Sequence, residues 1–283
     1  MEFPGLQQNI ALSKYTSFRV GGPAKYFCEV HTLDEFKQAL TFAESKQMRH
    51  FVLGSGTNVL FSDTGFDGLV IKNACNVITC EAGMIRAESG ALLSQIITCA
   101  RAQKMYGLEP LWGLPGTIGG AVRGNAGSFG VWTGEFVKEV RVWQSGKELI
   151  WKKDDLKFGY RSSLIKTTGA VALEVTLAWS KQDLKMELEE MNAKRLAKQP
   201  VGFSAGSFFK NPPGDQGAGE LIEAAGLKGF KIGGAQVSEK HANFILNTGT
   251  ATAADIKALA AEISSKVKAK FGIELEAEVL IVD

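Results

Sequence analysis

Leu108-Glu-Pro-Leu-Trp-Gly-Leu-Pro-Gly-Thr-Ile-Gly-Gly-Ala-Val-Arg-Gly-Asn-Ala-Gly127 is the most informative stretch of the sequence, because six of its residues are glycine. Glycine makes no side-chain contacts and loses more conformational freedom on folding than any other residue. Such a cluster therefore favours backbone that turns sharply or approaches a ligand closely, rather than a helix or a strand. Successive bare N–H groups can form a concave nest for phosphate oxygens. We expect a ligand-binding loop here; the alternative is a glycine-rich connection that binds nothing.

A second glycine turn lies earlier in the chain, at Gly54-Ser-Gly-Thr-Asn58. It follows the apolar run 51–53, which has the length and composition of a short buried strand. A strand that ends in a glycine turn is a common place to hold a phosphate. The turn is too short for the dinucleotide fingerprint, and no helical pattern follows it. A plain β-turn therefore remains an open alternative for this segment.

Length and composition predict an ordinary globular protein. A chain of 283 residues with 45% hydrophobic and 22% charged residues favours two domains with sizeable cores. The net charge of +2 and the interspersed charges argue against a nucleic-acid-binding protein. No apolar run is long enough to span a bilayer, and the Met1-Glu-Phe-Pro-Gly5 start does not resemble a signal peptide. The expected location is the cytosol, with no membrane insertion.

Cysteines and histidines predict no metal site. The spacing of Cys75 and Cys80 is unlike a zinc knuckle, and no histidine lies near them. All four cysteines, which include Cys28 and Cys99, are expected to be reduced and mostly buried.

Hydrophobic periodicity predicts helices and strands along the whole chain. Helices are expected after the capping box that begins at Thr32, and over 92–105, 183–198, 219–226 and 252–271. Strands are expected at 51–53, 68–71, 85–89, 171–179, 241–247 and 273–282, with a hairpin of 137–144 and 148–151 across Ser145-Gly146. Residues 13–30 are expected to form an extended start, a Gly-Gly-Pro turn and a strand. The charged helix that ends before Pro200 marks a change in composition, and a domain boundary is expected there.

Several polar residues lie where the fold does not obviously need them. The planar fork of Arg161 suits a carboxylate or phosphate, although its spacing alone favours a surface pair with Asp154 or Asp155. Ser207 precedes two phenylalanines and could reach an apolar site or simply occupy a turn. Glu278 could be functional, or it could share a solvated strand face with other glutamates. His241 is expected to be a structural histidine and not a catalytic one.

Eight motifs, in order and spacing, resemble the UDP-N-acetylenolpyruvoylglucosamine reductase family, flavoenzymes of bacterial peptidoglycan precursor synthesis. They occupy residues 16–24, 53–60, 107–121, 125–127, 158–163, 206–212, 233–245 and 275–279, so the resemblance covers nearly the whole chain. The short run between Arg161 and Ser207 is similar to the compact subclass that lacks an inserted tyrosine-bearing loop. No substrate tyrosine is therefore assigned.

The resemblance implies an α+β fold with an FAD-binding module of the vanillyl-alcohol-oxidase (PCMH) type. That module would span 1–196, with subdomains of about 1–75 and 76–196 that hold an extended FAD between them. A substrate-binding domain would span 197–271, and a last strand, 272–283, would return to the flavin. The implied FAD-binding residues are Gly54, Ser55, Gly56, Thr57, Asn58, Pro115, Gly116, Thr117, Gly119, Gly120, Ala121, Asn125, Ala126 and Gly127.

The resemblance also implies a reaction and roles for named residues. NADPH would reduce FAD, and hydride would pass from flavin N5 to the enolpyruvyl methylene carbon of the sugar nucleotide. Arg161 would bind the substrate carboxylate, Glu278 would help polarise it, and Ser207 would donate the proton. Lys210, Asn211 and His241 would contact the small-molecule substrate. The alternatives are another FAD-dependent oxidase or dehydrogenase on the same module, and a catalytically silent flavin or nucleotide binder.

Overall fold

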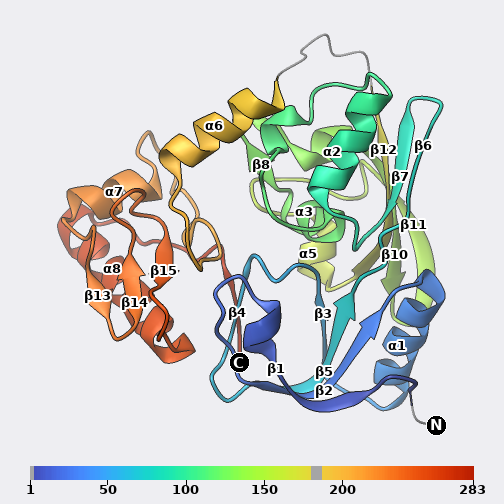
Figure 1. Ribbon diagram of the computed structural model, residues 1–283, viewed down its shortest axis with the longest axis horizontal. Coiled ribbons are helices and arrows are strands. Elements are labelled where there is room, and N and C mark those ends of the chain that lie inside the picture. Colours follow the sequence, from blue (N-terminus) through green and yellow to red (C-terminus); the bar gives the residue numbers. More distant parts are fainter. Residues whose placement is uncertain (1–2, 180–186) are drawn as a thin grey trace. The chain divides into compact units, whose positions relative to one another are not determined.

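The computed structural model describes residues 3–179 and 187–283, and it contains both helices and strands (Figure 1). The chain divides into two compact units. The first consists of Met1–Gln7, Phe27–Ser55 and Gly68–Arg195, and the second of Gln8–Tyr26, Gly56–Asp67 and Leu196–Asp283. Each unit has its own cluster of buried apolar side chains.

The larger sheet of the first unit is antiparallel, with the strand order β11-β10-β12-β7-β6. Its strands are β6 (Ile78–Glu81), β7 (Met84–Glu88), β10 (Val137–Gln144), β11 (Lys147–Lys152) and β12 (Val171–Ala178). The predicted hairpin is confirmed: β10 and β11 pair from Gln144 and Lys147 outward. Ser145 and Gly146 both have positive φ, 50° and 75°, which is the backbone a tight two-residue hairpin turn requires.

Short helices pack against this sheet and carry the glycine stretch. They are α2 (Leu93–Ala102), η2 (Glu109–Leu111), α3 (Ile118–Gly124), α4 (Thr133–Phe136) and α5 (Leu164–Thr168). Leu93, Ile96 and Ala100 of α2 are buried in the core beneath the helix. Helix α2 contacts β6 and β7, and α3 contacts β7 and β12 (Figure 1). The expectation of a helix-free glycine stretch is wrong, because residues 118–124 form α3.

A four-stranded sheet has the order β1-β2-β5-β3. The elements of this region are β1 (Gln7–Ala11), η1 (Leu12–Tyr15), β2 (Pro23–Val30), α1 (Leu33–Ser45), β3 (His50–Leu53) and β5 (Phe66–Asn73). The Thr32 side chain accepts from Glu35 N at 3.2 Å, which confirms the predicted start of α1. The extended conformation expected at 13–15 is wrong, because these residues belong to the 3-10 helix η1.

The second unit is built around a small antiparallel sheet covered by one long helix. Strands β13 (Lys231–Ile232), β14 (Ala235–Val237) and β15 (Ile245–Asn247) lie against α8 (Ala253–Phe271), and α8 also contacts α7 (Ala218–Ala224) (Figure 1). Strand β4 (Val59–Phe61) pairs in parallel with β16 (Leu280–Val282). The strand expected over 273–282 is therefore reduced to 280–282, with a separate bridge between Ala277 and Phe209. Helix α6 covers Leu188–Lys198, and residues 183–186 of the predicted helix lie outside the described residues.

The cysteine expectation is wrong for one pair. Cys80 on β6 and Cys99 on α2 form a disulfide, since the packing of the helix on the strand brings their Cα atoms to 6.7 Å. Cys28 and Cys75 are buried free thiols, and burial raises the pKa of each to about 12. Over 3–179 and 187–283, no helix combines the length and apolarity needed to cross a membrane. The same residues contain no group of three or more potential metal ligands.

Candidate active site

The predicted site residues are divided between the two units. The first unit contains Gly54, Ser55, Pro115, Gly116, Thr117, Gly119, Gly120, Ala121, Asn125, Ala126, Gly127 and Arg161. The second contains Gly56, Thr57, Asn58, Ser207, Lys210, Asn211, His241 and Glu278.

The N-terminal end of α3 is not an open phosphate nest. Ile118 N donates to Ala91 O at 2.8 Å, and Gly119 N donates to Ser89 O at 2.9 Å. Thr117 is the N-cap, and its hydroxyl oxygen accepts from Gly120 N at 3.4 Å. Because protein carbonyls already accept from Ile118 and Gly119, the nest expectation is wrong for these two amides.

The glycines of α3 nevertheless leave a bare surface that suits a flat ligand. A Cβ on Gly119 would lie 2.7 Å from Ser89 Cβ, so packing within the protein explains that glycine. Among the described residues, a Cβ on Gly120 would meet only Thr117 Oγ1 at 3.6 Å, and one on Gly124 would meet no atom within 4 Å. Neither residue has positive φ, and alanine is the better helix former. The fold alone therefore does not require Gly120 or Gly124, whereas a close-lying ring or phosphate would.

The first glycine turn lies against this stretch within the first unit. A Cβ on Gly54 would be 2.6 Å from Thr117 Oγ1, so the absence of a side chain lets the two segments approach. Gly56 has φ +65°, and a Cβ there would clash with the Tyr15 carbonyl. A turn that binds no ligand would not require steric constraints at both Gly54 and Gly56. Gly54 and Thr117 thus bring the two glycine segments together.

Asn125 and Arg161 connect the end of the stretch to the loop after β11. Asn125 has φ 43°, and its side chain bridges two segments: Nδ2 donates to Gly159 O at 2.9 Å, and Oδ1 accepts from Gly134 N at 2.9 Å. Arg161 is half-buried, and its Nη1 donates to Gly127 O at 3.4 Å. The first unit therefore brings Arg161 to the last glycine of the stretch.

In the second unit, Ser207 and Glu278 lie on neighbouring backbone segments. Glu278 N donates to the carbonyl of Phe208, the residue after Ser207, at 2.8 Å. Asn58 of the first glycine turn donates from Nδ2 to Glu278 O at 3.3 Å. Ser207 itself forms a β-bridge with Phe244. Three predicted residues from distant parts of the sequence are thus close together.

The environment of Glu278 differs from that of its neighbours. The side chains of Glu274 and Glu276 are 76% and 71% exposed and pair with Lys268 and Lys210. Glu278 is half-buried. The alternative of one solvated glutamate face therefore fits Glu274 and Glu276 but not Glu278.

The predicted substrate contacts flank the start of α7. Asn211 Oδ1 accepts from Ala218 N at 3.0 Å. The His241 ring packs on Phe244, and its Nδ1 accepts from Asn243 N at 3.2 Å. Burial lowers the pKa of His241, so the ring is neutral at pH 7 with its proton on Nε2. His241 can therefore donate a hydrogen bond but carries no charge.

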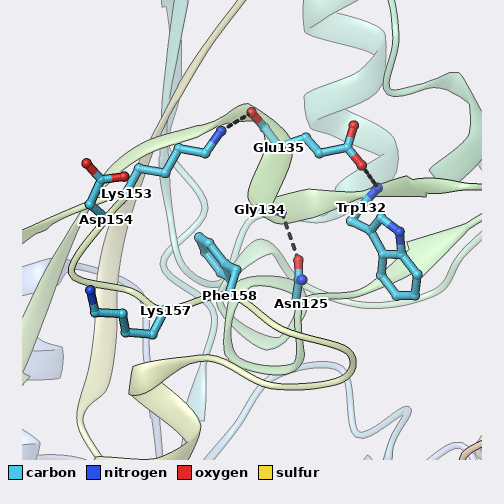
Figure 2. Close-up of a pocket in the computed structure, with 8 residues that line it drawn as sticks. All are labelled: Asn125, Trp132, Gly134, Glu135, Lys153, Asp154, Lys157 and Phe158. Atoms are coloured by element: carbon cyan, nitrogen blue, oxygen red, sulfur yellow. Dashed lines mark hydrogen bonds between the residues drawn. The ribbon is translucent and has the colours of Figure 1, made fainter. Parts of the chain in front are cut away.

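Figure 2 shows an open pocket of about 400 Å³ in the first unit. It is lined by Asn125, Trp132, Gly134, Glu135, Lys153, Asp154, Lys157 and Phe158. Lys153 Nζ donates to Glu135 O at 2.7 Å and so ties one side of the pocket together. Asn125 is the only predicted site residue in this lining, so we assign the site from the glycine segments and not from the pocket.

Sequence reasoning missed Arg195, which supports both ends of the glycine stretch. This buried residue of α6 donates from Nη2 to Pro110 O and to Ser128 Oγ, both at 3.0 Å, and from Nε to Trp112 O at 3.1 Å. Its spacing of four from the buried Met191 could have indicated a shared buried face.

Comparisons with known proteins match both parts of the chain. Residues 24–151 match the family model described as an FAD binding domain. Residues 198–282 match that of the UDP-N-acetylenolpyruvoylglucosamine reductase C-terminal domain.

Relatives with these names cover almost the whole chain. The UDP-N-acetylenolpyruvoylglucosamine reductase of Caldanaerobacter subterraneus is 41% identical over 284 residues, which are 98% of this chain and 93% of the relative. That of Clostridioides difficile is 40% identical over 278 residues, with 96% and 91% covered. The crystal structure of the Thermus caldophilus enzyme superimposes with a TM-score of 0.83 at 32% identity, and covers 98% of this chain and 100% of that one.

Proposed function

The chain belongs to the UDP-N-acetylenolpyruvoylglucosamine reductase family, and from this we propose that it reduces UDP-N-acetylglucosamine enolpyruvate to UDP-N-acetylmuramate in peptidoglycan precursor synthesis. It is an FAD-dependent oxidoreductase. NADPH is the proposed hydride donor. The observation that carries the proposal is identity of about two residues in five over 98% of the chain. Since NADPH and UDP-sugars are cytoplasmic metabolites, the cytoplasm is the proposed location.

The residues of the two glycine segments fit an FAD cofactor. Gly120 and Gly124 leave a bare helix surface, and Gly54 lets the first turn lie against Thr117. The backbone from Pro115 to Gly127 and from Gly54 to Asn58 would hold the cofactor. Bound FAD supplies hydride transfer between NADPH and the enolpyruvyl methylene carbon. The proposed division is a flavin module at 1–196, a substrate domain at 197–271 and a returning segment at 272–283.

Three side chains are proposed to act on the substrate. Negative charge grows on the substrate carboxylate as hydride reaches the methylene carbon, so donors aimed at that carboxylate lower the barrier. Arg161 provides a planar cationic donor. Glu278 is proposed to help polarise that carboxylate.

Ser207 is proposed to complete the reduction. Its hydroxyl proton moves to the carbon beside the carboxylate, and the resulting serine oxygen is reprotonated from solvent. A hydroxyl is a weak acid, but the dianionic enolate formed by hydride addition is a stronger base. Lys210, Asn211 and neutral His241 are proposed to contact the sugar nucleotide, with Nε2 of His241 as a donor.

The proposal is tested by anaerobic spectroscopy of the purified protein. We expect flavin absorbance that NADPH bleaches and that the enolpyruvyl sugar nucleotide restores. A protein without bound flavin, or a reduced protein that oxygen reoxidises rapidly and the sugar nucleotide does not, would contradict it. The second result would favour an oxidase on the same module.

A further inference from the structure

A short hairpin follows the glycine stretch and carries a tryptophan that the proposed chemistry has not used. Strands β8 (Gly127–Ser128) and β9 (Val131–Trp132) pair in antiparallel fashion, with Gly127 opposite Trp132. A Cβ on Gly127 would clash with the indole ring of Trp132. The absence of a side chain at 127 therefore lets the indole lie directly on the backbone at the end of the stretch.

Arg161 lies on the same indole. Its guanidinium carbon is 5.4 Å from the centre of the Trp132 ring, while its Nη1 donates to Gly127 O. Tyr160 contributes a second ring, 5.7 Å from the guanidinium and edge-to-face with Trp132. Cations within about 6 Å of an aromatic ring centre are attracted to its face, most strongly for tryptophan.

Hydrogen bonds that do not involve Arg161 also hold the backbone around Trp132. Trp132 N donates to Glu135 Oε1 at 2.9 Å, and the next residue, Thr133, donates from both N and Oγ1 to Ala126 O at 2.8 Å. Figure 2 shows the indole directed away from Lys153 and Asp154, on the far side of Glu135. The ring is thus a fixed surface against which a flexible side chain can be ordered.

The backbone of Arg161 is constrained, but its long side chain still has to be ordered. Arg161 has φ 53°, in the left-handed region, and Lys166 Nζ donates to its carbonyl at 3.0 Å, so its backbone is held in an uncommon conformation. An arginine side chain has large rotamer entropy, and ordering it in advance removes that loss from the binding step. An aromatic face attracts the cation without accepting from its N–H groups, so the ring and a carboxylate do not compete for the same donors.

We propose that Trp132 is a positioning residue, which presents the Arg161 guanidinium to the carboxylate of the substrate. This inference rests on the proposed function. It deepens that function by assigning part of the preference for the enolpyruvyl group to a residue that need not touch the substrate.

The experiment compares the dissociation constants of two ligands in holoenzyme variants. UDP-N-acetylglucosamine enolpyruvate carries the carboxylate, and UDP-N-acetylglucosamine lacks it. Trp132→Leu is expected to weaken binding of the first by roughly threefold to thirtyfold, the span of typical cation–π energies, and to leave the second within about twofold. Trp132→Phe, which keeps an aromatic face, should lie between. The rate of flavin reduction by NADPH should not change.

Two controls separate positioning from general damage. Trp151→Leu removes a half-buried indole from β11 and should leave the ratio of the two dissociation constants unchanged. In an Arg161→Ala background, Trp132→Leu should have no further effect on that ratio.

Equal weakening of both ligands by Trp132→Leu, or an unchanged ratio, would overturn the positioning role. A wild-type protein that neither prefers the enolpyruvyl ligand nor reduces it would instead overturn the proposed function, and the inference with it.

Discussion

Two adjacent glycines, Gly119 and Gly120, have different physical reasons to lack a side chain. Packing against Ser89 explains Gly119, whereas no atom of the described residues excludes a methyl group at Gly120. Sequence alone could identify the cluster as a candidate site, because each glycine loses much conformational entropy on folding and a cluster is rare without a structural or ligand-binding role. It could not tell which glycine serves packing and which serves a ligand, since that depends on neighbours far away in the sequence.

Gly120→Ala is therefore expected to separate stability from cofactor binding. Without FAD, the variant should be as stable as wild type or more stable by roughly 0.5–1 kcal/mol, because alanine favours the helix. FAD affinity should fall by about fivefold or more, because forcing a methyl group into a close contact costs about 1–3 kcal/mol. Urea unfolding of the apoprotein and titration with FAD measure the two effects.

Gly119→Ala is the matched comparison, and it should destabilise the apoprotein. If Gly120→Ala bound FAD as tightly as wild type, the bare surface of α3 would not be a cofactor contact.

Elements position the site through contacts that their own sequences hardly reveal. The charged residues and Pro200 predict helix α6, but the composition of 188–198 predicts a helix that is exposed to solvent. Its Arg195 is buried only because the carbonyls of Pro110 and Trp112 accept from it. Likewise, the alternation of 273–282 predicts a long strand, and tertiary pairing shortens it to 280–282.

Arg195→Met is expected to lower the free energy of unfolding by about 2–4 kcal/mol, because buried carbonyls lose their donors. It should also weaken FAD retention, since both ends of the glycine stretch are released. Chemical denaturation and flavin release on dilution measure these effects. Lys194→Met, which removes an exposed pair with Glu190, should change stability by less than about 0.5 kcal/mol. Similar effects of both substitutions would contradict the supporting role of Arg195.

Helix α8 begins with a capping box that makes a pH-dependent contribution to stability. Thr252 N and Gly234 N both donate to Asp255 Oδ2, at 3.0 and 3.2 Å. These bonds, that from Thr252 first, lower the pKa of Asp255 below its ordinary value.

Asp255→Asn should therefore be less stable than wild type at neutral pH. Because the folded-state pKa is lowered, this difference is fully present above the ordinary aspartate pKa and disappears as pH falls through the lowered value. Thermal unfolding of both proteins between pH 7 and strongly acidic pH measures it. Asp215→Asn, at an exposed turn position, is the control. A difference that stayed constant over this range would show that charge is not involved.

At the scale of the whole molecule, the motifs predicted the family and its fold class, because their order and spacing constrain the chain more than any single element does. The paired glycine segments and the closeness of Ser207 to Glu278 agree with those motifs. The Cys80–Cys99 disulfide could not be predicted, since it depends on how α2 packs on β6. The second unit also contains residues 8–26 and 56–67. The order of motifs along the sequence does not predict such a discontinuous unit.

The most direct test of the account is the rate of each half-reaction in Ser207→Ala, measured anaerobically by stopped-flow flavin absorbance beside wild type. The account predicts that NADPH bleaches the flavin at the wild-type rate, and that the enolpyruvyl sugar nucleotide restores its colour at least about a hundredfold more slowly, the usual loss when a positioned acid is removed. Equal slowing of both half-reactions, or wild-type reoxidation, would contradict it.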